Sequence, residues 1–172
     1  MKVFITGVAG TGKSTIAKAL NEQGHITVDF SDYPKLRYWR HKRTKEKSEY
    51  SPENDVSWFD EHECVCDVDE LKKLFTQHKD IVVTGVSTGT EALNLFDKVI
   101  LLQSSPETIR HRMETRDRIF GKKKEEQDNV IEWRKTFDPM ILSHGAIPIS
   151  SEGTLEEVVA KIIIVMSKEN PV

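Results

Sequence analysis

The stretch GVAGTGKS at residues 7–14, directly after the apolar run KVFIT, constrains this chain more than any other feature. It matches the pattern Gly-x-x-x-x-Gly-Lys-Ser/Thr in full, between a predicted strand and a predicted helix, which is the context of a phosphate-binding loop. Gly7, Gly10 and Gly12 let the backbone turn tightly, so that successive amides and the helix N-terminus face phosphate oxygens. The chain is therefore predicted to hold a nucleoside triphosphate.

The side chains of this loop have predicted roles of their own. Lys13 is expected to bridge the β- and γ-phosphates of ATP, and the Ser14 hydroxyl is expected to ligate Mg²⁺. The residues expected to contact the nucleotide here are Gly7, Val8, Ala9, Gly10, Thr11, Gly12, Lys13, Ser14 and Thr15. Motors, switches and transferases share such loops, so the reaction must be inferred from other residues.

Strand-like and helix-like segments alternate along the rest of the chain, which is typical of a parallel α/β sheet with helices on both faces. Strands are predicted at residues 2–6, 26–30, 80–85, 98–104 and 146–150. Helices are predicted at residues 14–24, 68–78, 105–116, 125–143 and 154–166, with a short helical piece around 90–96. Pro139 should bend or restart its helix. The length of 172 residues suits one domain spanning residues 1–172.

Composition and cysteine spacing narrow the class of protein. The net charge of −3 gives no overall attraction to nucleic acid or anionic membranes. No apolar stretch is long enough to cross a bilayer and no signal-peptide pattern is present, so we expect a cytoplasmic protein. Cys64 and Cys66 are too close in sequence for an ordinary disulfide, and His62 is the one further metal ligand nearby. We expect reduced thiols on a loop or short strand, with zinc as the alternative.

Residues 31–68 interrupt the alternation with prolines, aromatic residues and charges that follow no sustained period. Within them, KLRYWRHKRTKEK mixes basic and aromatic residues, as single-stranded nucleic-acid binders do. The position after the second strand also suits a part that binds an anionic acceptor, with Arg37 and Arg40 as candidate cations. Trp39 and Trp58 are either stacking faces or packing residues.

The ends of two strands indicate where chemistry would occur. Asp29 ends the second strand, and ligand sites in open parallel sheets lie beyond the carboxyl ends of strands. It could hold Mg²⁺ through water or orient an acceptor hydroxyl, and Asp32 is near enough to share this task; the alternative is a turn cap. The third strand ends in TGVSTG, where Gly85 could let a ligand approach the backbone. A motor-type NTPase carries a metal-binding acid at this place, so its absence argues against a motor.

The segment RHRMETRDRIFGKKK places Arg112 and Arg116 four residues apart on one predicted helical face, followed by a loop with lysines around Gly121. Arginines bind phosphoryl oxygens in a bidentate manner, and a mobile basic loop could close over the transferring group and exclude water. The alternative is a solvated, charged helix end. Arg110 and Arg118 are predicted to lie at the surface.

Taken in order, these segments resemble the small P-loop kinases of the nucleoside monophosphate kinase and shikimate kinase type over essentially the whole chain. The resemblance implies a three-layer P-loop NTPase fold with a five-stranded parallel sheet of order 2-3-1-4-5. It also implies that residues 31–68 bind the acceptor, that residues 116–127 form a lid, and that SSEGT at 150–154 lies at the adenine. Arg112 and Arg116 would contact ATP phosphates.

Two long runs look more narrowly like a bacterial subgroup of kinase-like ATP-binding proteins: TRDRIFGKKKEEQDNVIEW and FDPMILSHGAIPISSEGTLEEVV. The chain departs from two better-known groups at the third strand. It has VVTGVSTG where adenylate kinases carry Asp-Gly-Phe/Tyr-Pro-Arg and shikimate kinases carry three glycines. Its acids are spaced Asp29-x-x-Asp32 rather than Asp-x-Asp. Neither AMP bound in the usual manner nor shikimate is therefore predicted.

The sequence as a whole predicts an ATP- and Mg²⁺-dependent phosphotransferase for a small molecule, with nucleotides and nucleoside-like compounds among the acceptors considered. The predicted site residues are Lys13, Asp29, Arg112 and Arg116 for catalysis, Asp29, Asp32, Arg37 and Gly85 for the acceptor, and Ser14 and Asp29 for the metal. One alternative is an ATPase that drives a protein partner's assembly without phosphoryl transfer. Another is an RNA contact through KLRYWRHKRTKEK. The acceptor's identity and the oligomeric state stay open.

Overall fold

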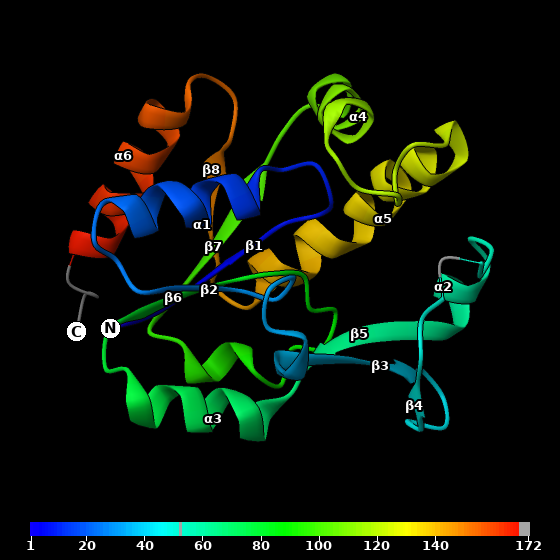
Figure 1. Cartoon of the computed structure of the whole chain (residues 1–172), viewed down its shortest axis with the longest axis horizontal. Helices are drawn as coiled ribbons and strands as arrows, with labels where there is room; N and C mark the ends of the chain where they lie inside the picture. The colour runs from blue at the N-terminus through cyan, green and yellow to red at the C-terminus, as the bar shows by residue number, and fades with distance from the viewer. Residues whose placement is uncertain (52, 169–172) are drawn as a thin grey trace.

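The computed structural model describes residues 1–51 and 53–168, and its strands and helices alternate as predicted (Figure 1). The strands are β1 (Lys2–Thr6), β2 (Thr27–Asp29), β3 (Arg37–His41), β4 (Lys47–Ser48), β5 (His62–Cys66), β6 (Ile81–Thr84), β7 (Lys98–Gln103) and β8 (Ile147–Ser150). The α-helices are α1 (Lys13–Glu22), α2 (Trp58–Glu61), α3 (Val68–Gln77), α4 (Pro106–Thr115), α5 (Lys124–Ser143) and α6 (Leu155–Ser167). Single 3₁₀ turns lie at Pro34–Leu36 and Leu93–Leu95.

The main sheet is parallel and has β1 at its centre. β1 pairs with β6 on one side and with β7 on the other, while β2 and β8 form the edges. The resulting order is β2-β6-β1-β7-β8, which is the order 2-3-1-4-5 when the strands of this sheet are numbered along the chain. The predicted fold class is thus confirmed. Since all these strands run in parallel, their carboxyl ends meet at one edge, where α/β proteins bind their ligands.

Two hydrophobic cores fix helices to the two faces of the sheet. Alternate side chains of a strand point to opposite faces, so Phe4 packs with α3, α4 and α5, whereas Val3 and Ile5 pack with α1 and α6. Figure 1 shows α1 and α6 together on one side of the sheet and α3 on the other. This three-layer packing holds the loop between β1 and α1 at the carboxyl edge of the sheet.

Residues 31–68 contain a small antiparallel sheet, of order β4-β3-β5, that the sequence did not predict. Its strands are short and their exposed faces carry charges, so no period was long enough to detect. The backbone amide of Asp67 donates to the Leu36 carbonyl at 2.8 Å, and the Asp67 side chain caps α3. Cys64 and Cys66 lie on β5 as free, buried thiols. Burial raises the pKa of both, that of Cys66 to about 12.

The sequence predicted a bend or a restart at Pro139; helix α5 runs through this residue without a restart. Proline removes one backbone donor, so the carbonyl of Lys135, one turn earlier, loses its helical partner. Both residues are exposed, and water can reach that carbonyl. The buried side chains of Phe137 and Ile141 hold the helix against the sheet on either side of the proline. In the part of the chain that the structure describes, no helix has the length and apolar character needed to span a membrane.

Candidate functional site

The phosphate-binding loop lies where the sequence placed it, between β1 and α1. Gly12 caps α1 with a φ of 91°, a left-handed conformation that glycine adopts without strain. The Thr11 hydroxyl is buried and donates to the Val8 carbonyl at 2.9 Å, which closes the loop on itself. The backbone amides at the start of α1 are therefore oriented toward a ligand before one binds.

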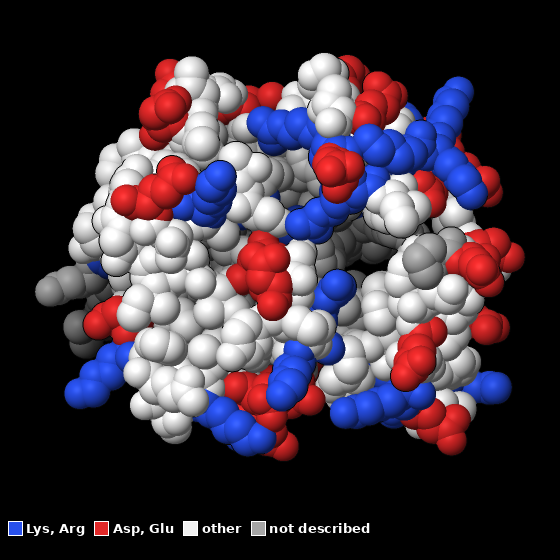
Figure 2. All heavy atoms as spheres, in the orientation of Figure 1, with Lys and Arg blue, Asp and Glu red and all other residues white. Residues whose placement is uncertain are grey.

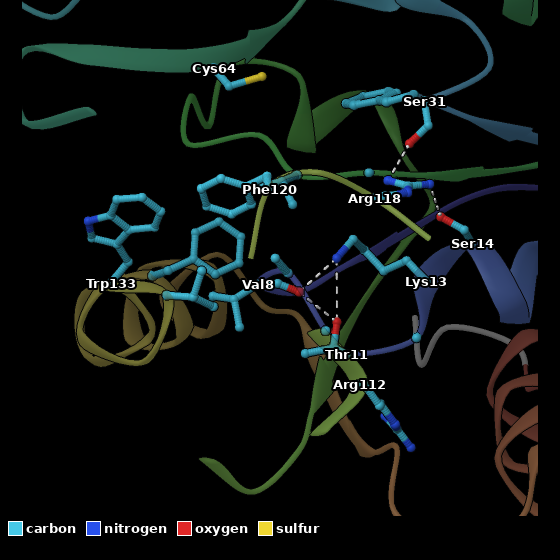
Figure 3. Close-up of a pocket in the computed structure, with 18 of the residues that line it drawn as sticks. Val8, Thr11, Lys13, Ser14, Ser31, Cys64, Arg112, Arg118, Phe120 and Trp133 are labelled. Atoms are coloured by element: carbon cyan, nitrogen blue, oxygen red, sulfur yellow. Dashed lines mark hydrogen bonds between the residues drawn. The ribbon is translucent and has the colours of Figure 1, made fainter. Parts of the chain in front are cut away.

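Lys13 folds back over this loop (Figure 3). Its Nζ donates to the carbonyls of Gly7 at 2.7 Å and Val8 at 2.8 Å. Burial of the ammonium lowers the pKa of Lys13 to about 7; the Asp29 carboxylate opposes this shift, and the nearby arginines of the lid add to it. A phosphate ligand would reverse the shift, because an anion beside the ammonium favours its charged form.

Asp29 sits at the end of β2 as a buried carboxylate with two anchors. Its Oδ1 accepts the Ser31 backbone amide at 2.7 Å, and its Oδ2 accepts the Thr84 hydroxyl at 2.9 Å. Burial by itself would raise the pKa of Asp29, but the hydrogen bonds from Ser31, Ser14 and Thr84 outweigh it and hold the pKa below its usual value. The carboxylate is thus ionised and fixed in orientation at neutral pH.

The oxygen-bearing side chains near the loop are suitable ligands for Mg²⁺. Ser14 offers a hydroxyl and Asp29 an ionised carboxylate, both hard oxygen ligands of the kind this ion prefers. Among the described residues there is no group of three or more His, Cys, Asp or Glu that could hold a metal by itself. That agrees with an ion that takes most of its ligands from substrate phosphates and water.

A single cavity of about 1010 Å³ connects the phosphate loop with the small antiparallel sheet. The space-filling view shows the surface hollowed here, with Lys and Arg side chains at the upper edge (Figure 2). The predicted residues that line it are Val8, Ala9, Gly10, Thr11, Gly12, Lys13, Ser14, Thr15, Asp29, Arg37, Gly85, Arg112 and Arg116. Two predicted site residues, Gly7 and Asp32, do not line the cavity. The carbonyl of Gly7 instead receives Lys13, and Asp32 is exposed in the turn after β2.

Arg112 and Arg116 both reach the cavity from the end of α4, as predicted. Arg112 donates to the Ser104 and Ser151 hydroxyls at 3.2 Å and to the Ser151 carbonyl at 2.8 Å, so its guanidinium is held firmly. Arg116 donates to the Phe120 carbonyl at 2.6 Å, while its buried Nε has no partner in the described chain.

Arg118 was predicted to be a surface residue, and this is only half correct. The residue is exposed, but its guanidinium donates to the hydroxyls of Ser14 at 3.3 Å and Ser31 at 3.1 Å (Figure 3). Spacing could not reveal this, because Arg118 follows the end of α4, in a turn where its amide donates to the Arg116 carbonyl. The helical spacing that identified Arg112 and Arg116 cannot identify Arg118, because the residue lies beyond the helix.

The far end of the cavity is largely aromatic. The register of β3 and β5 pairs Trp39 with Cys64, and both line the cavity with Arg37. Phe59 of α2 contacts Phe120 of the lid at 5.8 Å and Trp133 of α5 at 5.1 Å between ring centroids. The sequence missed these three aromatic residues, since no local pattern shows that α2, the lid and α5 meet.

Arg40, the other candidate cation, does not point into the cavity. It pairs with Glu63 and Glu91, each at 2.8 Å. The neighbouring Lys45 also pairs with Glu63, and Lys42 donates to the Phe59 and Asp60 carbonyls. These contacts use several of the bases in KLRYWRHKRTKEK within the fold, so fewer remain for nucleic acid.

A family model described as an AAA domain matches residues 3–132. The chain belongs to this family. No curated protein matches it significantly. Among solved structures it resembles shikimate kinase from Aquifex aeolicus, with 19% identity, 96% of both chains covered and a TM-score of 0.58. It also resembles deoxyadenosine kinase from M. mycoides with bound dATP, with 15% identity, 98% of this chain and 100% of that one covered, and a TM-score of 0.60.

A third likeness is to shikimate kinase from Bacteroides thetaiotaomicron, with 16% identity, 98% and 99% coverage and a TM-score of 0.58. At such identities the likeness concerns the fold. The chain thus has the fold of small P-loop kinases of the nucleoside monophosphate and shikimate kinase type, and the resemblance inferred from the sequence is confirmed.

Proposed function

We propose that the protein is an ATP-dependent kinase that phosphorylates a hydroxyl group of a small molecule. The observation that carries this proposal is the position of Asp29, an ionised carboxylate lining the cavity that joins the phosphate loop to the aromatic end, or chamber. A hydrolase needs room only for water beside the γ-phosphate. A cavity of about 1010 Å³ has room for a second substrate beside the nucleotide.

The residues at the loop would position the donor. The loop amides and Lys13 would hold the β- and γ-phosphates, while Arg112, whose guanidinium lies beside Gly12, and Arg116 would contact them from the end of α4. Mg²⁺, when bound to Ser14 and through water to Asp29, would neutralise phosphate charge. Phosphoryl transfer depends mainly on such positioning and charge stabilisation.

Asp29 would orient the acceptor. It accepts a hydrogen bond from the acceptor hydroxyl and so aims that oxygen at the γ-phosphorus. The new oxygen–phosphorus bond forms as the bond to the β–γ bridging oxygen breaks, and ADP leaves with that electron pair. The hydroxyl proton passes to Asp29 and then to water. The Thr84 and Ser31 contacts keep the carboxylate in place during this step.

The chamber favours a flat acceptor with an anionic group, as in a nucleotide. Trp39, Phe59 and Trp133 offer aromatic surface for a ring. Arg37 has no carboxylate partner among the described residues, and its hydrogen bond to the Cys64 sulfur is long, at 3.8 Å. Its guanidinium can therefore take a phosphate or carboxylate. The cytoplasmic location predicted from the sequence would supply ATP.

An acceptor screen tests the proposal. ADP formation would be followed with nucleosides, nucleoside monophosphates, sugars and hydroxy acids, and we expect one class to raise the rate. If none does while a protein partner does, the ATPase alternative replaces the kinase.

Lys13→Ala should lower ADP formation at least about 100-fold, because it removes the charge that stabilises the transferring phosphate. Lys18→Ala is the matched control: Lys18 is exposed on the same helix, away from the cavity, and its loss should leave the rate unchanged. Equal ADP formation by the Lys13 variant and the parent protein would rule out catalysis at this loop.

A further inference from the structure

Arg118 ties the lid to the phosphate loop. Its two hydrogen bonds reach Ser14 at the start of α1 and Ser31 in the turn after β2 (Figure 3). Within the described residues, the contact with Ser14 is the one hydrogen bond from residues 116–127 to the loop at 7–14. The Arg118 side chain therefore joins the lid both to the phosphate loop and to the turn after β2.

The place that Arg118 occupies is the one expected for a metal ion. The Ser14 hydroxyl that it contacts lies near the Asp29 carboxylate, and these two side chains are the expected oxygen ligands for Mg²⁺. The charge of Arg118 is close enough to lower the pKa of Lys13. A guanidinium and a divalent cation repel each other at such short range, so both cannot occupy this place.

The rest of the lid is ordered around this contact. Phe120 packs against Phe59 and Trp133, and Gln127 donates to the Gly121 carbonyl at 3.0 Å. Lys122 donates to carbonyls at the end of α4. A lid fixed in this way does not drift aside by itself, and the Arg118 contact closes the phosphate end of the cavity.

We propose that Arg118 is a latch, which closes the phosphate end of the cavity by holding Ser14 and Ser31 and must be displaced when Mg²⁺ and ATP bind. The proposal rests on the proposed function in taking Ser14 as the residue that faces the metal. It adds that the metal ion itself helps to open the site. Arg118 acts on nucleotide entry and is a positioning residue.

Stopped-flow binding of a fluorescent ATP analogue tests the latch without measuring transfer. Arg118→Gln should speed association about fivefold with Mg²⁺, because two hydrogen bonds to a charged group are removed. Ser31→Ala, which removes one of them, should speed it less. Both effects should grow when EDTA removes the metal, since the metal then no longer helps to displace Arg118. Trypsin should cleave the lid faster at Lys122–Lys124 in both variants.

Arg110→Gln is the control, because it removes an exposed arginine of α4 that pairs with Asp128 and lies outside the cavity. It should change neither rate. Slower or unchanged association in Arg118→Gln, or no effect of Ser31→Ala, would overturn the latch and leave Arg118 as a simple phosphate contact. Nucleotide association and trypsin cleavage can be measured whether or not an acceptor is phosphorylated. A protein that transfers no phosphoryl group would contradict the proposed kinase function but not the latch.

Discussion

Lys13 carries a proton that is held only loosely at neutral pH. Its ammonium is enclosed by its own loop, where carbonyl oxygens replace water, and burial lowers its pKa to about 7. Asp29 differs, because its hydrogen bonds overcome the effect of burial and keep it ionised. The cavity therefore lowers the pKa of both residues by different means: burial does so for Lys13, and hydrogen bonds do so for Asp29.

Nucleotide affinity should fall as the pH rises above 7. Free Lys13 loses its proton there, whereas bound phosphates raise its pKa, so binding must then take up a proton. We expect the dissociation constant for Mg·ATP to increase about tenfold between pH 7 and pH 8.5. Calorimetry in buffers of different ionisation enthalpy measures the proton directly. Lys13→Arg keeps its charge across this range and should lose the pH dependence; a variant with the same slope would contradict the assignment.

Among the elements, β2 and β6 together position Asp29. Their register places Asp29 opposite Thr84, so a strand pair supplies both the carboxylate and its anchor. Gly85 follows Thr84 at a point where the Phe30 ring passes so closely that a Cβ would lie 2.2 Å from it. The glycine is needed for this packing, whereas the sequence had suggested that it lets a ligand approach.

Gly85→Ala should therefore destabilise the protein by about 1–3 kcal/mol, because the added methyl group forces Phe30 aside. Chemical denaturation measures this loss. Gly24→Ala is a useful contrast, since a Cβ there meets nothing within 4 Å and its cost comes from the left-handed backbone alone. The double variant Gly85→Ala with Phe30→Leu should regain part of the stability. If it does not, the contact with Phe30 is not the cause.

At the scale of the whole molecule, aromatic contacts join parts that are distant in sequence. Phe59 touches the lid through Phe120 and α5 through Trp133, so the small sheet, the lid and the core helix meet at one side chain. The three rings pack as one aromatic cluster that holds residues 116–127 against α2 and α5.

Phe59→Ala should loosen the lid, since it removes the ring on which Phe120 rests. We expect faster trypsin cleavage at Lys122–Lys124 and a change in tryptophan fluorescence from Trp133. Phe75→Ala is the matched control, because Phe75 contacts Phe96 on α3's side of the sheet and does not line the cavity. Equal cleavage of both variants would show that general destabilisation, rather than the junction, opens the lid.

The sequence by itself determined the phosphate loop, the five strands of the main sheet and the place of Asp29 at the end of the second strand. These features are local: a glycine pattern, buried β-branched runs and the end of a strand each act within a few residues. Arg112 and Arg116 could also be found, because a helix repeats every 3.6 residues and places both on one face.

Only the tertiary structure decided the rest. It turned Arg40 toward Glu63 and Glu91, brought Arg118 onto Ser14, and gathered Phe59, Phe120 and Trp133 into one wall. These contacts join segments far apart in the chain, and packing rather than any local preference selects them. The phosphate loop was therefore readable from the sequence, whereas the aromatic end of the cavity and the Arg118 contact depend on how the layers come together.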